Sequence, residues 1–263
     1  MHVSRHVYGD QTFQFADLRV PDGEGPYPAI ILIHGGFWRS RYSLDLMNDM
    51  AVDLTRRGYV TWNIEYRRVG HKGGGWPGTV QDVAAAIDHL DTLAGQVEID
   101  LGRLGVVGHS AGGHLALWQA ARAKRSFGAE EGLGIKKPLV QPTSIVSLAG
   151  VSDLRHMHQV RRNDSPVQAF MGGTPDELPG EYLLASPIEL LPLGVPQLLV
   201  HGTEDENVPY EQSVSYVEAA ERAGDSVDLL TLEGTDHFAV IDPTSDVWAL
   251  IVEHVMKLVP LSR

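Results

Sequence analysis

The chain has 263 residues, of which 43% are hydrophobic and 21% charged, values typical of a folded protein with a sizeable core. Its formal net charge of −13 disfavours nucleic acids and anionic membranes as partners, because their phosphate groups are repelled. The absence of cysteine excludes disulfides, thiolate nucleophiles and cysteine-ligated zinc.

The first ten residues, MHVSRHVYGD, lack the apolar segment of a secretory signal peptide. No apolar stretch of the sequence is as long as a membrane-spanning helix. We therefore expect a cytoplasmic protein with neither a membrane nor a nucleic-acid partner. The oligomeric state stays open, with a homodimer as one alternative.

Predicted strands and helices alternate along most of the chain. Hydrophobic periodicity and turn residues predict strands over 11–20, 29–36, 59–66, 103–108, 144–150, 195–202 and 226–234. The same signals predict helices over 43–57, 79–94, 111–124, 211–223 and 244–258. Gly58 closes the first of these helices, and Thr79 is a candidate N-cap of the second.

This alternation predicts an α/β fold in three layers, with a mostly parallel twisted sheet and helices on both faces. The first strand is expected to be antiparallel. Residues 151–190 contain several prolines and glycines and are expected to be irregular. They are too few for an independent domain, so we expect a single domain over 1–263 with a short lid-like segment at about 151–190.

A serine stands where a buried strand gives way to a helix. The stretch is RLGVVGHSAGGHLALWQAARAK (103–124), with Gly108 and Gly112 two positions to either side of Ser110. Glycines there remove Cβ atoms that would collide with the neighbouring strand and helix, so the hydroxyl can be held out toward a cleft. Ser110 is therefore a candidate nucleophile. The alternative is that it only caps the helix.

A serine hydroxyl needs a base, and the base needs an acid that orients it. His237 follows the last predicted strand and is the candidate base, whereas His201 lies at a strand end where packing of the turn is expected. Asp205 lies in the loop after the preceding strand and is the candidate acid. Asp153, which follows an earlier strand, is its strongest rival.

Acyl transfer also needs N–H donors for the developing oxyanion. One candidate donor is the backbone N–H of Ala111, directly after the serine. The others are Gly36 and Phe37, in the glycine-rich loop that His34 begins. His34 could hold this loop by hydrogen bonds, and a plain glycine turn is the alternative.

The chain resembles serine hydrolases of the α/β-hydrolase fold that carry an HGG oxyanion loop. The matching motifs are HGGFW (34–38), GHSAGGHLA (108–116), SP (186–187), HGTEDENVP (201–209) and GTDH (234–237). They are similar to those of the arylformamidase (kynurenine formamidase) and carboxylesterase or feruloyl-esterase-like groups. Phe37 departs from the glycine of the hormone-sensitive-lipase type, and the N-terminal helical cap of that type is not matched. Nothing matches a peptidase β-propeller.

The resemblance implies an acyl-enzyme on Ser110 and requires no metal or organic cofactor. The expected substrates are small carboxylic esters, with N-formyl aromatic amines as the alternative. A non-catalytic binding protein on the same fold is a remote third possibility, since such proteins usually lose a member of the triad. His156 and His158 are a weak metal signal without a third ligand and are expected to be exposed loop histidines.

Overall fold

The computed structural model describes residues 1–124 and 133–262, and its centre is a sheet of eight strands. The order across the sheet is β1-β2-β4-β3-β5-β6-β7-β8. β1 is antiparallel to β2 and β2 to β4, whereas β4, β3, β5, β6, β7 and β8 are parallel to one another. The strands are β1 (His2–Val7), β2 (Phe15–Val20), β3 (Tyr27–Ile33), β4 (Val60–Ile64), β5 (Ile99–His109), β6 (Ser144–Leu148), β7 (Gln197–Gly202) and β8 (Val227–Leu232).

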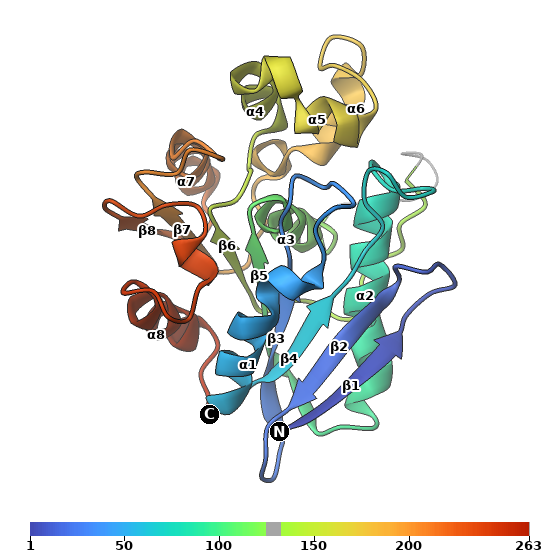
Figure 1. Cartoon of the computed structure of the whole chain (residues 1–263), viewed down its shortest axis with the longest axis vertical. Helices are drawn as coiled ribbons and strands as arrows, with labels where there is room; N and C mark the ends of the chain where they lie inside the picture. The colour runs from blue at the N-terminus through green and yellow to red at the C-terminus, as the bar shows by residue number, and fades with distance from the viewer. Residues whose placement is uncertain (125–132, 263) are drawn as a thin grey trace.

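Helices cover both faces of the sheet (Figure 1). α1 (Asn48–Arg56) and α8 (Trp248–Leu258) pack on one face, and α2 (Gly78–Ala94), α3 (Ala111–Ala121) and α7 (Glu211–Ala223) on the other. Successive residues of β3 alternate between the two cores, because side chains of a strand point to opposite faces. Ile30 and Leu32 lie in the core under α1 and α8, and Ile31 and Ile33 in the other. The predicted three-layer α/β architecture is confirmed.

The sequence located most elements but missed some boundaries. β1 was not expected, since its alternation leaves both faces partly exposed. The prediction that Thr79 caps α2 is wrong, because the helix begins at Gly78. The Thr79 hydroxyl instead donates to the carbonyl of Arg67 and accepts from the N–H of Gly75, so it ties together the loop before the helix.

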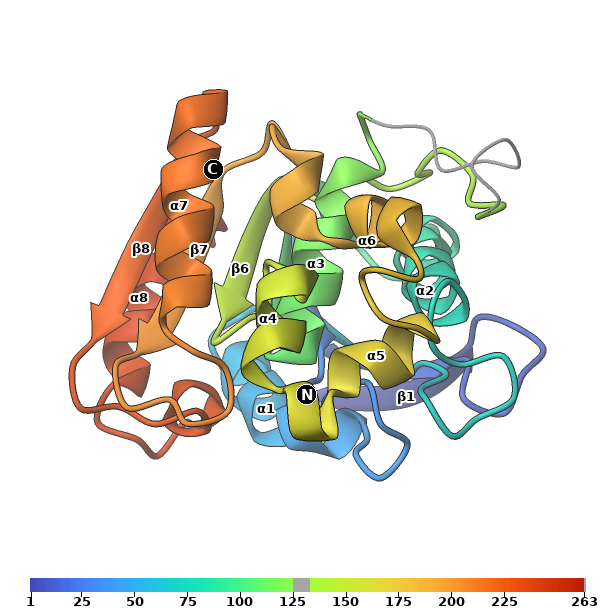
Figure 2. The ribbon, with the colours of Figure 1, turned by 90° about the horizontal axis from the view of Figure 1, so that it is seen from above.

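Segment 151–190 is more ordered than its composition predicted. It forms α4 (Leu154–Val160), α5 (Pro166–Met171) and α6 (Pro179–Ala185), with one 3₁₀ turn between α4 and α5 and another after α6, so the expectation of an irregular segment is wrong. Two of its prolines begin helices, a position where the missing N–H costs nothing. His114 and Trp118 of α3 bond to carbonyl groups of α6, which fixes the segment over the core (Figure 2).

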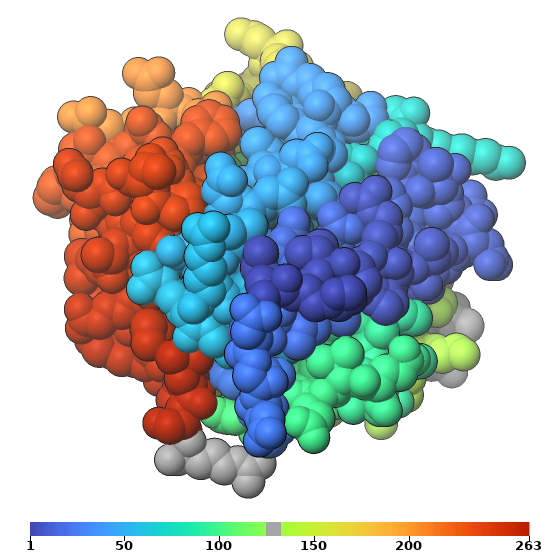
Figure 3. Space-filling model, turned by 60° about the horizontal axis from the view of Figure 1, so that its bottom comes forward, coloured from blue at the N-terminus to red at the C-terminus, as the bar shows by residue number. Residues whose placement is uncertain are grey.

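Both chain ends lie at the end of the sheet away from α4, α5 and α6 (Figure 1). Figure 3 shows this end, where the first strands, the α1 segment and the C-terminal segment lie side by side. The Tyr59 hydroxyl donates to the carbonyl of Val259, and Arg103 donates to the carbonyls of Pro260 and Leu261. Among the helices that the structure describes, none is long and apolar enough to cross a bilayer.

Candidate active site

Ser110 occupies a sharp turn between β5 and α3. Its backbone has φ 57° and ψ −118°, a conformation that L-residues rarely adopt and that costs about 1–3 kcal/mol. Its N–H donates to the carbonyl of Leu148 on the adjacent β6 over 2.8 Å, which helps to hold the turn. The Ser110 side chain makes no capping hydrogen bond to α3, so capping does not account for a serine here.

The flanking glycines allow this turn because no Cβ atom fits at either position. A Cβ on Gly108 would lie 2.0 Å from the carbonyl oxygen of Gly112, and one on Gly112 would lie 2.0 Å from that of Ile33. Strand and helix therefore approach closely on both sides of the serine. The spacing of the glycines in the sequence reflects this packing.

His237 and Asp205 meet across the loops that follow β8 and β7. His237 Nδ1 donates to Asp205 Oδ2 over 2.6 Å, while Asp205 Oδ1 accepts the N–H groups of Asn207 and Val208. Burial alone would raise the pKa of Asp205. Hydrogen bonds from His201, His237 and the Val208 N–H outweigh burial and hold the pKa well below its usual range. Asp205 is therefore an ionised carboxylate against His237.

Asp153, the rival candidate acid, makes different contacts from those of Asp205. Its carboxylate accepts the N–H groups of Arg155 and His156 and caps α4. His201 is fully buried and has its Nδ1 2.7 Å from the Ser213 hydroxyl and its Nε2 3.0 Å from the Val208 carbonyl. His201 therefore binds the turn, as expected, and its Nε2 also lies 3.2 Å from Asp205 Oδ2, the oxygen that His237 binds.

His109, the residue before the nucleophile candidate, supports His237. Its Nε2 donates to the carbonyl of His237 over 2.9 Å, and the two rings lie 4.6 Å apart. Burial, followed by the charge of His237, lowers the pKa of His109 to about 3. His109 is therefore a neutral donor at neutral pH. No local sequence pattern predicts this contact, because it joins segments 128 positions apart.

A small cavity brings Ser110 and His237 together. Its volume is about 30 Å³, and its lining also includes the predicted oxyanion residues Gly36 and Phe37. The other lining residues, none of which is among the predicted site residues, are Tyr42, Leu46, His109, Asn207 and Phe238. A wider groove of about 480 Å³ adjoins it at Asn207, His237 and Phe238 and is lined by Glu204, Glu206 and Asp236.

The loop after β3 has an unusual backbone. Gly36, Phe37 and Trp38 all have positive φ, at 108°, 54° and 55°. This run turns the loop beside Ser110. Ala111 is the first residue of α3, where an N–H has no acceptor within the helix. Trp38 does not line the cavity: it is fully buried and stacks on Phe170 at 4.7 Å.

His156 and His158 lie on α4 and are partly buried, so the expectation of exposed loop histidines is wrong. His156 Nδ1 is 3.1 Å from the Gln212 amide and His158 Nδ1 is 2.8 Å from the Ser165 hydroxyl. Within residues 1–124 and 133–262, no three histidine, aspartate or glutamate side chains are grouped so as to hold a metal ion.

Comparison with known proteins identifies the family and the fold. The BD-FAE family model matches residues 16–219. Esterase LipC of Mycobacterium tuberculosis is 28% identical over 98% of this chain and 66% of its own length. Kynurenine formamidase of Danio rerio is 24% identical over 96% of the chain and 80% of its own length.

Solved structures of esterases share the fold. The phosphonate-inhibited Esterase B of Lactobacillus rhamnosis superposes with a TM-score of 0.83, at 20% identity, over 99% of this chain and 86% of that one. The α/β-hydrolase fold expected from the motifs is therefore confirmed. The chain spans slightly less than two thirds of LipC and 62% of a rice protein described as a probable isoprenylcysteine alpha-carbonyl methylesterase.

The close approach at Gly112 predicts a large loss of stability on adding one methyl group. Gly112→Ala should lower the free energy of unfolding by about 1–3 kcal/mol or more, since the new Cβ meets the rigid backbone of β3. Gly180→Ala in α6 is the matched control, because nothing lies within 4 Å of its Cβ position. Thermal unfolding followed by circular dichroism compares them, and equal midpoints would contradict the packing argument.

Proposed function

The chain belongs to the BD-FAE family, and from this membership and the geometry at Ser110 we propose that it is a serine hydrolase of small carboxylic esters. One observation carries the proposal. The base candidate His237 is bound to an ionised Asp205 over 2.6 Å and lines the same small cavity as Ser110. A nucleophile, a base and an orienting acid are the parts that acyl transfer needs.

In the proposed reaction, His237 accepts the Ser110 proton as the hydroxyl oxygen attacks the ester carbonyl. Asp205 holds the other ring nitrogen and stabilises the imidazolium that forms. His237 then donates this proton to the departing alkoxide, which leaves an acyl-enzyme on Ser110. Water, deprotonated by His237, attacks that ester, and the acid is released as Ser110 recovers its proton. The sequence of steps uses only these side chains and water.

The developing oxyanion is proposed to bind the N–H groups of Ala111, Gly36 and Phe37. Ala111 offers the first N–H of α3, on the positive end of the helix. The positive φ values of Gly36 and Phe37 turn their peptide groups beside Ser110, and both residues line its cavity. Donors fixed in advance stabilise the transition state without reorganisation.

The helical segment 151–190 is proposed to act as a cover for this site within a single domain over 1–263. Arg161, at the end of α4, donates to the carbonyls of Glu206 and Asn207 in the loop that carries Asp205. Its guanidinium also lies 5.5 Å from the ring centre of Phe37. The segment therefore contacts both the acid loop and the oxyanion loop. A cytoplasmic location and the lack of nucleic-acid and membrane partners stay predictions from the sequence.

Hydrolysis of N-formyl aromatic amines is the second candidate activity. It is favoured by the similarity to kynurenine formamidase and by the small cavity at Ser110, which suits a formyl group. The same triad would serve, with an amine in place of the alkoxide as leaving group. Turnover of N-formylkynurenine, compared with that of aryl acetates, separates the two candidates.

Ser110→Ala should abolish ester hydrolysis and leave the thermal unfolding midpoint close to that of the wild type, because the hydroxyl makes no helix cap. The wild type should react stoichiometrically with a fluorophosphonate, and mass spectrometry should place the label on Ser110. A wild-type rate in the variant would remove Ser110 from the mechanism. An unlabelled wild type would favour a non-catalytic protein.

Asp205→Asn should lower kcat by about three to four orders of magnitude, since the amide favours the wrong tautomer of His237. Asp153→Asn is the matched control and should keep kcat within about twofold, because asparagine also caps helices well. Steady-state kinetics on p-nitrophenyl acetate measures both variants. A larger loss in the Asp153 variant would move the acid to the earlier loop.

The size of the cavity predicts a preference for short acyl groups. About 30 Å³ holds one or two water-sized groups, so an acetyl group fits and longer chains collide with the lining. The kcat/KM for p-nitrophenyl acetate should exceed that for the hexanoate by about tenfold or more. The shared leaving group keeps the chemistry constant. An equal or faster rate with hexanoate would mean that the acyl chain occupies the wider groove instead.

A further inference from the structure

The oxyanion loop, which runs from His34 to Leu44, has a strained backbone that other residues must hold in place. Gly36, Phe37 and Trp38 are three successive residues in the left-handed region, and two of them carry Cβ atoms. Such conformations persist only where the surrounding structure holds them. A buried carboxylate outside the proposed triad bonds to both ends of this loop.

That carboxylate is Glu65, which directly follows β4 and is 2% exposed. Its Oε1 accepts a hydrogen bond from His34 Nε2 over 2.9 Å, and its Oε2 accepts the Leu44 N–H over 3.2 Å. His34 and Leu44 stand at the two ends of the oxyanion loop. A single side chain therefore binds both ends and sets the distance between them.

The charge of Glu65 is maintained by its neighbours. Its Oε1 also accepts the Tyr66 N–H over 2.9 Å and lies 3.1 Å from an Arg68 guanidinium nitrogen that is itself buried. Burial would raise the pKa of Glu65. Hydrogen bonding and charge from His34, with the charge of Arg68, outweigh burial and lower the pKa. Every hydrogen-bonding partner of the two oxygens is thus an N–H donor.

His34 transmits this anchor to the loop. Its Nδ1 donates to the carbonyl of Gly35 over 2.7 Å, and its ring stacks on Tyr66 with centres 4.3 Å apart. The Tyr66 hydroxyl donates to the His34 carbonyl over 2.6 Å. The ring cannot turn without losing a hydrogen bond to Glu65 or to Gly35. Moving Glu65 would therefore move the peptides that lead into Gly36.

We propose that Glu65 is a positioning residue that fixes the oxyanion loop for catalysis. It lines neither the cavity at Ser110 nor the adjoining groove, so it acts through His34 and Leu44 on the backbone of Gly36 and Phe37. The inference rests on the proposed function, since it assigns the loop a role in the same reaction.

Glu65→Gln tests the inference with little change of shape. The amide NH₂ must face either the Leu44 N–H or the donors on the other oxygen, so one loop anchor is lost. We expect kcat per active site, counted by fluorophosphonate titration, to fall about tenfold or more, as misplaced oxyanion donors would cause. KM should stay within about twofold, because the interaction lost forms in the transition state. The pH at which kcat is half-maximal should not move, since Glu65 does not contact His237.

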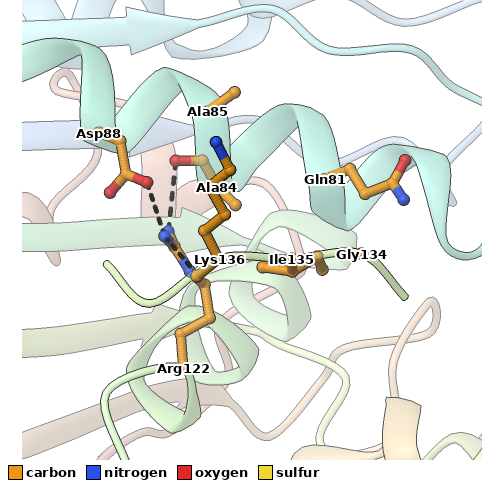
Figure 4. A pocket seen from close by; sticks show the side chains of 8 residues that line it. All are labelled: Gln81, Ala84, Ala85, Asp88, Arg122, Gly134, Ile135 and Lys136. Atoms are coloured by element: carbon orange, nitrogen blue, oxygen red, sulfur yellow. Dashed lines mark hydrogen bonds and ion pairs between the residues drawn. The ribbon is translucent and has the colours of Figure 1, made fainter. Parts of the chain in front are cut away.

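Asp88→Asn is the matched control for the loss of a buried ion pair. Asp88 on α2 binds Arg122, which is 3% exposed, over 2.7 Å (Figure 4). Neither residue lines the cavity at Ser110. The Glu65 variant removes the carboxylate charge beside Arg68, and the Asp88 variant removes the one beside Arg122, so each leaves a buried cation without its partner. Both guanidinium groups also have a buried nitrogen that makes no hydrogen bond. The control should lower the unfolding midpoint but keep kcat per titrated site. Equal kcat losses in both variants would overturn the proposal.

Two further variants keep the test decisive. Glu65→Asp retains the charge and should recover part of the kcat lost in Glu65→Gln. If Glu65→Gln does not fold, His34→Phe keeps the ring on Tyr66 while removing both hydrogen bonds, and kcat per titrated site should again fall. If neither folds, Glu65 is needed for folding and the positioning role is rejected.

A wild type without ester or formamide turnover rejects the proposed function, whereas an active wild type with an unaffected Glu65→Gln rejects only this inference.

Discussion

The close backbone approach around Ser110 is the constraint on which the rest of the site depends. A Cβ at Gly108 on β5 would lie 2.0 Å from the Gly112 carbonyl oxygen, and one at Gly112 on α3 would lie 2.0 Å from the Ile33 carbonyl oxygen on β3. Helix α3 therefore meets both strands with no space for side chains. This packing forces Ser110 into its strained conformation and frees its hydroxyl from the helix. It also places the first N–H groups of α3 beside Ser110, so one turn positions both the proposed nucleophile and one proposed oxyanion donor.

The groups proposed to act on this hydroxyl come from loops whose positions depend on the order of the strands. β6, β7 and β8 follow β5 across the sheet, so the loops after β7 and β8 are neighbours. Asp205 and His237, 32 positions apart, therefore meet over 2.6 Å. The His109 ring ties this pair back to the turn at Ser110 through the carbonyl of His237. The site is thus held together by the backbone turn at Ser110, by the neutral donor His109 and by the hydrogen bond between His237 and Asp205.

The oxyanion loop has a strained backbone, since Phe37 and Trp38 carry Cβ atoms and would otherwise favour negative φ. The stacking of Trp38 on Phe170 and the hydrogen bonds of Glu65 to His34 and Leu44 hold the loop in this conformation. Burying the charged Glu65 carries a desolvation penalty, so its ion pair is weak evidence for a gain in stability. The ion pair is better explained by the geometry that it imposes on the loop. In this chain the buried Glu65, paired with Arg68, thus lies behind a loop whose strained residues include Phe37 and Trp38.

The sequence alone determined the layered α/β architecture, because apolar periods and glycine turns report local structure directly. It also located Ser110, Asp205 and His237 as candidates, because each follows a predicted strand at the edge where loops of a parallel sheet converge. The tertiary structure showed that Asp205 binds His237 whereas Asp153 caps α4, revealed helices in 151–190, and brought His109 against His237 and Glu65 against His34. These depend on contacts between segments far apart in the chain, which local patterns do not encode.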